Sequence, residues 1–164
     1  MVKVKNVMIN SPFRWRTEAD GSHVLTSTAA VDMDYMHNGV QCVAKVRFFG
    51  ESSDGHGFRC DGLSVPKILR WFLPSWDKKN ALYNVAGALH DWLYSTGGNY
   101  GDFTREECDD FFCGLLRESG KGRFKTWCAD KALERFAGGK SHWKNDGYGV
   151  AKFAMMEVHH CPTK

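Results

Sequence analysis

The sequence predicts an α+β fold built as one domain over residues 1–164. A chain of this length suits a single domain, and its 43% hydrophobic and 25% charged residues are typical of a folded globular protein. Residues 1–70 contain short runs rich in β-branched and aromatic residues, which favour strands, whereas residues 78–139 contain apolar residues at helical spacing. No element is assigned to the tail, residues 140–164.

Strands and hairpins are predicted for the first part of the chain. The stretches "SHVLTSTAAV" and "GVQCVAKVRFFG" have the composition of strands, and "ADGS", "HNG" and "SSDGHG" punctuate them with residues that tight turns favour. The segment "DGHG", residues 54–57, is therefore expected to be a hairpin loop. Further on, "CDGLSVP" indicates a tight turn at Asp61 and Gly62 before a new segment begins.

The first predicted helix lies between Lys78 and Tyr94. Its apolar residues recur with helical spacing and form one stripe, which consists of Leu82, Val85, Ala86, Leu89, Trp92 and Leu93. Gly97 and Gly98 are expected to end this helix.

Two more helices are expected after it. The second is predicted to open at Thr104, because "TREE" has the form of a capping box with Glu107. Its buried face is expected to contain Cys108, Phe111, Phe112, Leu115 and Leu116, and Gly120 and Gly122 close it. The third is predicted from about residue 124 to residue 136, before two glycines. Because a loop of about nine residues joins the first two helices, we expect them to lie antiparallel and in contact.

Charge and cysteine content exclude several classes of protein. The formal net charge is +3 with both signs interspersed, so nucleic acid is not an expected partner. The six cysteines form no CxxC pair and are expected to be reduced core residues, since the N-terminus lacks a signal peptide.

No transmembrane segment is expected, and membrane contact is peripheral at most. His159 and His160 are interpreted as surface residues at a frayed end.

Four residues on the two main helices could carry out chemistry. His90 and Tyr94 share one side of the first helix, and Asp91 is turned about 100° from His90 around the axis. Asp109 lies at the edge of the apolar face of the second helix, where an unpaired carboxylate is costly. Asp109 could accept a hydrogen bond from His90 and fix its tautomer, as in hydrolases. An equally favoured alternative is that His90 and Asp109 form a buried polar pair that only holds the two helices together.

The turn at Asp61 also has two interpretations. It is either a plain turn or part of a site at which Asp61, Asp91 and backbone carbonyl groups bind Ca²⁺ through oxygen ligands. Two carboxylates that lie close together repel each other unless a cation or a proton intervenes. A divalent ion would remove that conflict.

The motifs of the helical half resemble those of two protein families. Taken in order, "CDGLSVP", "ALHDWLY", "REECDDFF" and "ALERFAGG" resemble a family of small phage and prophage proteins of unknown function, whose pattern is TDGASVP, then HDxLY, then RxxAD. This resemblance covers about residues 58–139 and includes the order and spacing of the motifs. More distantly, the HDxxY helix is similar to that of prokaryotic phospholipases A2.

The second resemblance implies a mechanism and a set of site residues. It implies that His90 is the general base with Asp109 and Tyr94 as supports, and that Asp61, the Gly62 carbonyl and Asp91 are Ca²⁺ ligands. The expected function is a phage-encoded, Ca²⁺-dependent hydrolase of a phospholipid or another ester. The expected location is the host cytoplasm or the virion.

Two other functions suit the same resemblance. The first is a non-catalytic phage structural or host-interaction protein that keeps the helix pair as a scaffold and binds a virion or host protein. The second is a cell-wall lysis factor, which ranks last because the sequence has neither a zincin motif nor a clear pair of catalytic glutamates.

Overall fold

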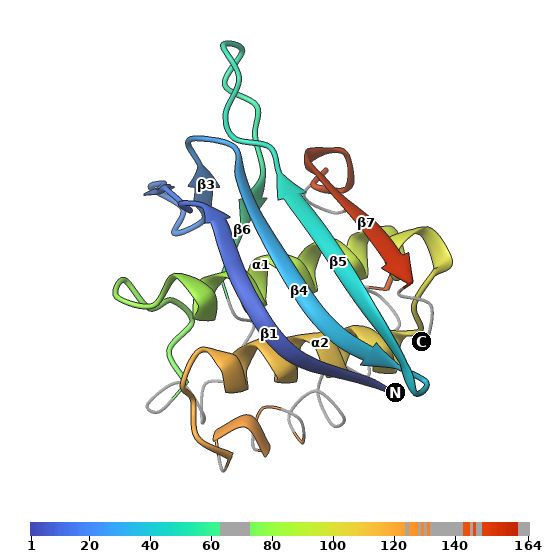
Figure 1. Ribbon diagram of the computed structural model, residues 1–164. Coiled ribbons are helices and arrows are strands. Elements are labelled where there is room, and N and C mark those ends of the chain that lie inside the picture. Colours follow the sequence, from blue (N-terminus) through green and yellow to red (C-terminus); the bar gives the residue numbers. More distant parts are fainter. Residues whose placement is uncertain are drawn as a thin grey trace.

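The computed structural model describes residues 1–62, 73–123, 125–127, 129, 131, 143–144, 146 and 149–160. In this part of the chain, a four-stranded antiparallel sheet is covered on one face by two helices, α1 (Ala81–Thr96) and α2 (Arg105–Glu118) (Figure 1). The predicted α+β fold, with strands first and a contacting helix pair second, is confirmed.

The four-stranded sheet combines strands from both ends of the chain. Its order is β1 (Val2–Ser11), β4 (Ala29–His37), β5 (Val40–Phe48) and β7 (Ala154–His160). A two-residue turn joins β4 to β5, and both of its residues, Asn38 and Gly39, have positive φ angles of 51° and 86°. That conformation is the one that the "HNG" sequence favours.

The hydrophobic core lies between this sheet and the helices. Side chains of β4 and β5 alternate between the core and the outer face, as expected for strands buried on one side. The buried members are Ala29, Val31, Met33, Tyr35, Cys42, Ala44, Val46 and Phe48. The cysteines at 42, 60, 108 and 113 are buried, which confirms the predicted role as small core residues for these four, while Cys128 and Cys161 lie outside the described residues.

A second, smaller sheet brings the end of the strand-rich part to the first helix. It has the order β2 (Trp15–Thr17), β3 (His23–Leu25) and β6 (Arg59–Cys60). A loop joins β5 to β6, and its tip is closed by a hydrogen bond from the Ser52 amide to the His56 carbonyl, 2.9 Å long. β6 contacts α1, so the residues that follow β6 are held beside that helix.

The first predicted helix is present with a slightly later start. The Asn80 side chain caps α1 by accepting a hydrogen bond from the Tyr83 amide, 3.0 Å away, so the helix begins after Asn80 instead of at Lys78. Gly97 ends it in the left-handed conformation, with a φ of 65°. A short 3₁₀ turn, η2 (Asn99–Gly101), follows.

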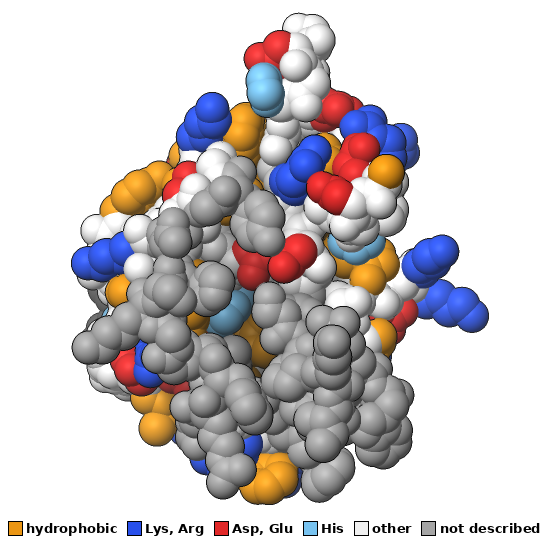
Figure 2. All heavy atoms as spheres, turned by 180° about the vertical axis from the view of Figure 1, so that it is seen from behind, with side chains coloured by type: hydrophobic (Ala, Val, Ile, Leu, Met, Phe, Trp, Pro, Cys, Tyr) orange, Lys and Arg blue, Asp and Glu red, His pale blue; other side chains and the backbone are white. Residues whose placement is uncertain are grey.

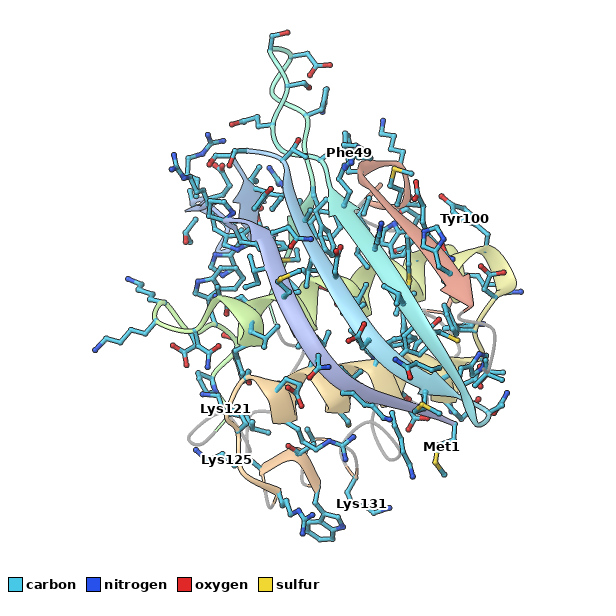
Figure 3. The ribbon with its side chains drawn as sticks, viewed as in Figure 1. Met1, Phe49, Tyr100, Lys121, Lys125 and Lys131 are labelled. Carbon is cyan, nitrogen blue, oxygen red and sulfur yellow. The ribbon has the colours of Figure 1, made fainter. Side chains whose placement is uncertain are left out.

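The second helix begins with the predicted capping box. The Thr104 hydroxyl accepts from the Glu107 amide, and the Glu107 carboxylate accepts from the Thr104 amide. The same carboxylate pairs with His37 Nε2 at 2.7 Å and with the Met1 amine at 3.2 Å. Glu107 therefore ties the start of α2 to the end of the sheet where Met1 lies (Figure 3). Cys108, Phe111, Phe112, Leu115 and Leu116 are all buried, as predicted.

The described residues after α2 include a third helix, which was predicted, and a final strand, which was not. Residues 123, 125–127, 129 and 131 are helical, which confirms a short third helix, while its predicted end at residues 136–139 lies outside the described residues. The prediction that His159 lies on the surface is confirmed, but the expected frayed end is wrong there, because β7 pairs with β5 and His159 lies opposite Val43. A 3₁₀ turn, η3 (Ala151–Phe153), leads into β7. No described helix is both long and apolar enough to cross a bilayer.

Candidate functional site

The candidate site is built on the contact between α1 and α2. The two helices run in opposite directions on the same face of the sheet (Figure 1). Two hydrogen bonds fix their register, one from the Asn80 amide group to the Ser119 carbonyl, 2.7 Å long, and one between His90 and Asp109. The start of α1 therefore faces the end of α2, and the middle of each helix faces the middle of the other.

His90, Tyr94 and Asp109 form one hydrogen-bonded group across this contact. His90 Nε2 lies 2.9 Å from Asp109 Oδ1, and the Tyr94 hydroxyl donates to the same oxygen at 2.8 Å. The side chains of His90 and Asp109 are 14% and 17% exposed, so both are sheltered while retaining some contact with solvent. An ionised carboxylate only accepts hydrogen bonds, so the proton of a neutral His90 is assigned to Nε2, and the lone pair lies on Nδ1.

Aromatic rings hold the imidazole in place. The ring centroids of His90 and Tyr94 are 4.2 Å apart, and those of His90 and Phe112 are 5.0 Å apart. The Trp143 ring packs edge-on against Tyr94 at 5.2 Å. Burial raises the pKa of Tyr94, and its hydrogen bond to Asp109 raises the pKa further, so the hydroxyl remains protonated and continues to donate.

Asp91 is turned away from this group and has an unsatisfied oxygen. Its Oδ2 atom is buried without a hydrogen-bond partner in the described part of the chain. Burial raises the pKa of Asp91 well above its usual value, and the negative charge of Asp61 raises it further. The carboxylate of Asp91 is therefore stable only when a proton or a cation compensates its charge.

Asp61 and Gly62 directly follow β6 and approach α1 from the side of the smaller sheet. Gly62 has a φ of 81°, and a Cβ atom there would lie 2.4 Å from the Ser75 carbonyl oxygen, so this position requires glycine. Cys60 is buried before the turn, and burial followed by the charge of Asp91 raises the pKa of its thiol. Asp61 lies within electrostatic range of Asp91, while the residues after Gly62 that would complete the predicted turn lie outside the described part of the chain.

The predicted site residues therefore form two neighbouring groups. His90, Tyr94 and Asp109 share hydrogen bonds, whereas Asp61 and Asp91 share an electrostatic interaction. No group of three or more His, Cys, Asp or Glu side chains among the described residues is arranged to hold a metal ion. A cation here would need carbonyl oxygens besides the two carboxylates, as Ca²⁺ sites commonly use. Figure 2 shows acidic side chains beside a histidine near the middle of the face opposite the sheet.

Two residues beside the site were not predicted. Cys60 is adjacent to Asp61 in the chain, but a cysteine in a strand-like run indicates only burial. Trp143 belongs to the tail, where the pattern predicts no element, and nothing in its spacing connects it to Tyr94. Both reach the site through packing between segments that are distant in sequence.

The fold and the site define an α+β protein with a histidine–carboxylate pair between two antiparallel helices. The chain belongs to the family described as "Protein of unknown function (DUF1353)", whose profile matches residues 51–132, half of the chain. The matched segment contains β6, α1 and α2, and with them all the candidate site residues. Comparisons with curated proteins and with solved structures found no match.

Proposed function

We propose that this chain is a Ca²⁺-dependent ester hydrolase in which His90 activates a water molecule. The hydrogen bond between His90 Nε2 and Asp109 Oδ1 carries the proposal, because a general base needs one nitrogen held by an acceptor and the other available to a proton. Asp109 would stabilise the imidazolium that forms when Nδ1 takes the proton. Tyr94 would keep the Asp109 carboxylate in position.

The residues around Asp91 fit a calcium ion. The buried, unpartnered Oδ2 atom and the repulsion from Asp61 are two unfavourable features that one cation would remove. Asp61, Asp91 and the Gly62 carbonyl would hold the ion, whose oxygen-rich ligand set is the kind that Ca²⁺ prefers. When bound, the ion would polarise the ester carbonyl and stabilise the oxyanion.

The substrate and the origin of the protein are proposed from sequence resemblance. The order and spacing of the motifs in residues 58–139 support a phage-encoded protein, and the HDxxY helix supports a phospholipase-A2-like reaction on a phospholipid or a related ester. Such a protein would contact membranes only peripherally, in the host cytoplasm or as part of the virion.

The proposal is tested by measuring fatty-acid release from phospholipid vesicles in Ca²⁺ and in EGTA. We expect release only with Ca²⁺, and we expect His90→Gln to lower the rate by about 10²–10⁴-fold, the usual contribution of a general base. His159→Gln is a matched control, because the side chain of His159 is 55% exposed on β7. Release that is unaffected by EGTA and by His90→Gln would rule out this function.

A non-catalytic scaffold is the second candidate. One observation favours it: His90 and Tyr94 bind a single carboxylate oxygen and so join two helices, which is also what a purely structural clip would do. Calorimetric titration with Ca²⁺ separates the candidates, because a scaffold of this kind has no need for the ion. Heat of binding that disappears in Asp91→Asn supports the hydrolase, and the absence of binding heat supports the scaffold.

A further inference from the structure

A groove of about 370 Å³ lies apart from the His90 group, between the segment that follows β1 and the start of α1. Its lining includes three aromatic residues, Phe13, Trp15 and Trp76, and two basic residues, Lys78 and Lys79. The volume is in the range of small-molecule sites, which combine apolar walls with a few polar groups. Neither the proposed hydrolysis nor the family match assigns this groove a role.

The aromatic walls of the groove are fixed by their own packing. The rings of Phe13 and Trp15 are stacked with an interplanar angle of 22°, and Trp76 meets Trp15 edge-on at a centroid distance of 5.3 Å. Trp76 is also stacked on His23, with a centroid distance of 3.6 Å. Rings held in this way form a pre-organised surface for a flat apolar group, since little side-chain freedom is lost on binding.

The charge at the rim of the groove is positive. The lining includes no acidic residue, and the carboxylate of Asp77 accepts hydrogen bonds from the Lys79 amide at 3.0 Å and from Lys121 Nζ at 3.1 Å. Lys121 lies beyond the end of α2 (Figure 3), so it compensates Asp77 from outside the groove. Lys78 and Lys79 are both exposed, and their ammonium groups are therefore available to an anion in the groove.

We propose that this groove binds a small organic anion that carries a flat apolar ring. The ring would pack against Trp15 and Trp76, and the anionic group would be bound by Lys78 and Lys79. A Cβ atom on Gly62 would lie 3.6 Å from Trp76 Cε3, so the groove adjoins the candidate Ca²⁺ site. Neither Asp61 nor Asp91 lines the groove, and the ligand is therefore expected to bind without Ca²⁺ and without the proposed hydrolysis.

The test is calorimetric titration of the whole chain with phenyl phosphate in the presence of EGTA, which removes any contribution from a bound cation. Phenol and inorganic phosphate provide the ring and the charge separately. We expect phenyl phosphate to bind at least roughly tenfold more tightly than either, because only it uses both parts of the groove. Equal binding of inorganic phosphate, or no binding of phenyl phosphate at about 10 mM, would overturn the proposal.

Surface variants locate the site without disturbing the core. Lys78→Gln with Lys79→Gln should weaken phenyl phosphate binding roughly tenfold, as expected for the loss of two partly solvated charge contacts. Lys3→Gln with Lys5→Gln removes the same charge from exposed positions at the far end of β1 and should change nothing. If both pairs of substitutions weaken binding equally, only the net charge attracts the ligand, and the proposal that the ligand binds in the groove is refuted.

Discussion

Burial raises the pKa of Asp91, and the charge of Asp61, which directly follows β6 and is distant in sequence, raises it further. The contact between β6 and α1 creates this relationship, and burial of Asp91 makes it strong. An acidic pair of this kind is unfavourable for a protein without a bound cation. It therefore makes stability depend on pH, and the proposed Ca²⁺ would offset the repulsion.

We predict that Asp91 makes the calcium-free protein less stable as the pH rises. The pKa of Asp91 is higher in the folded than in the unfolded chain. Its contribution to the free energy of unfolding is therefore fully present below the unfolded pKa of about 3.9 and is lost as the pH rises through the folded pKa. Asp91→Asn should remove this loss of stability at higher pH, and Ca²⁺ should offset the loss in the unmodified chain. Urea unfolding at a series of pH values measures the effect.

Asp77 provides a control of opposite sign for that experiment. A hydrogen bond from the Lys79 amide, followed by one from Lys121, lowers the pKa of Asp77. The contribution of Asp77 to the free energy of unfolding is present above its unfolded pKa and is lost as the pH falls through its folded pKa. Asp77→Asn should therefore remove stability at neutral pH, whereas the same result for Asp91→Asn would contradict the role given to Asp91.

The Gly62 turn should not tolerate a side chain. Gly62→Ala places a Cβ atom 2.4 Å from the Ser75 carbonyl oxygen at a φ of 81°, and we expect a loss of more than about 2 kcal/mol in the free energy of unfolding. Gly55 has a similar φ of 79°, and a Cβ atom there would have nothing within 4 Å, so Gly55→Ala should cost only about 1 kcal/mol. Equal losses in chemical denaturation would show that the close contact has no effect.

The His90–Asp109 bond should appear as an energetic coupling between two helices. A double-mutant cycle with His90→Gln and Asp109→Asn is expected to give a coupling of about 1–3 kcal/mol, because both side chains are largely sheltered. The His159–Glu157 pair, 3.8 Å apart with both side chains more than half exposed, is the control, and its coupling should be close to zero. Additive effects at positions 90 and 109 would show that the bond contributes nothing.

Loss of the cap on α2 should destabilise the helix that carries Asp109. Thr104→Ala removes the hydroxyl that accepts from the Glu107 amide, and we expect a loss of about 1 kcal/mol in thermal or chemical unfolding. Thr104→Ser keeps the hydroxyl and should retain most of the stability. If both substitutions cost the same, the capping hydrogen bond is not the cause.

The helices were predictable because their signals are local. The apolar stripe of α1 and the capping box of α2 lie within a few turns of chain, and glycines follow both helices. The His90–Asp109 hydrogen bond then followed from the antiparallel packing that a short loop favours.

The parts that were not predictable depend on contacts between distant segments. β7 has buried Ala154 and Met156 in alternation with exposed Met155 and Glu157, but so short a run in an otherwise irregular tail resembles an extended end. Its assignment as a strand comes only from its pairing with β5. The interaction between Asp61 and Asp91 likewise requires β6 to rest against α1, which no spacing along the chain indicates.

The position of β7 also bears on how the protein is made. β5 pairs with β4 through a short turn, but in the described part of the chain its other edge is paired with β7, which is synthesised more than a hundred residues later. Until then, the nascent chain presents an unpaired strand edge with a hydrophobic face, which is a template for association with other chains. Assistance during biosynthesis would matter most in that interval.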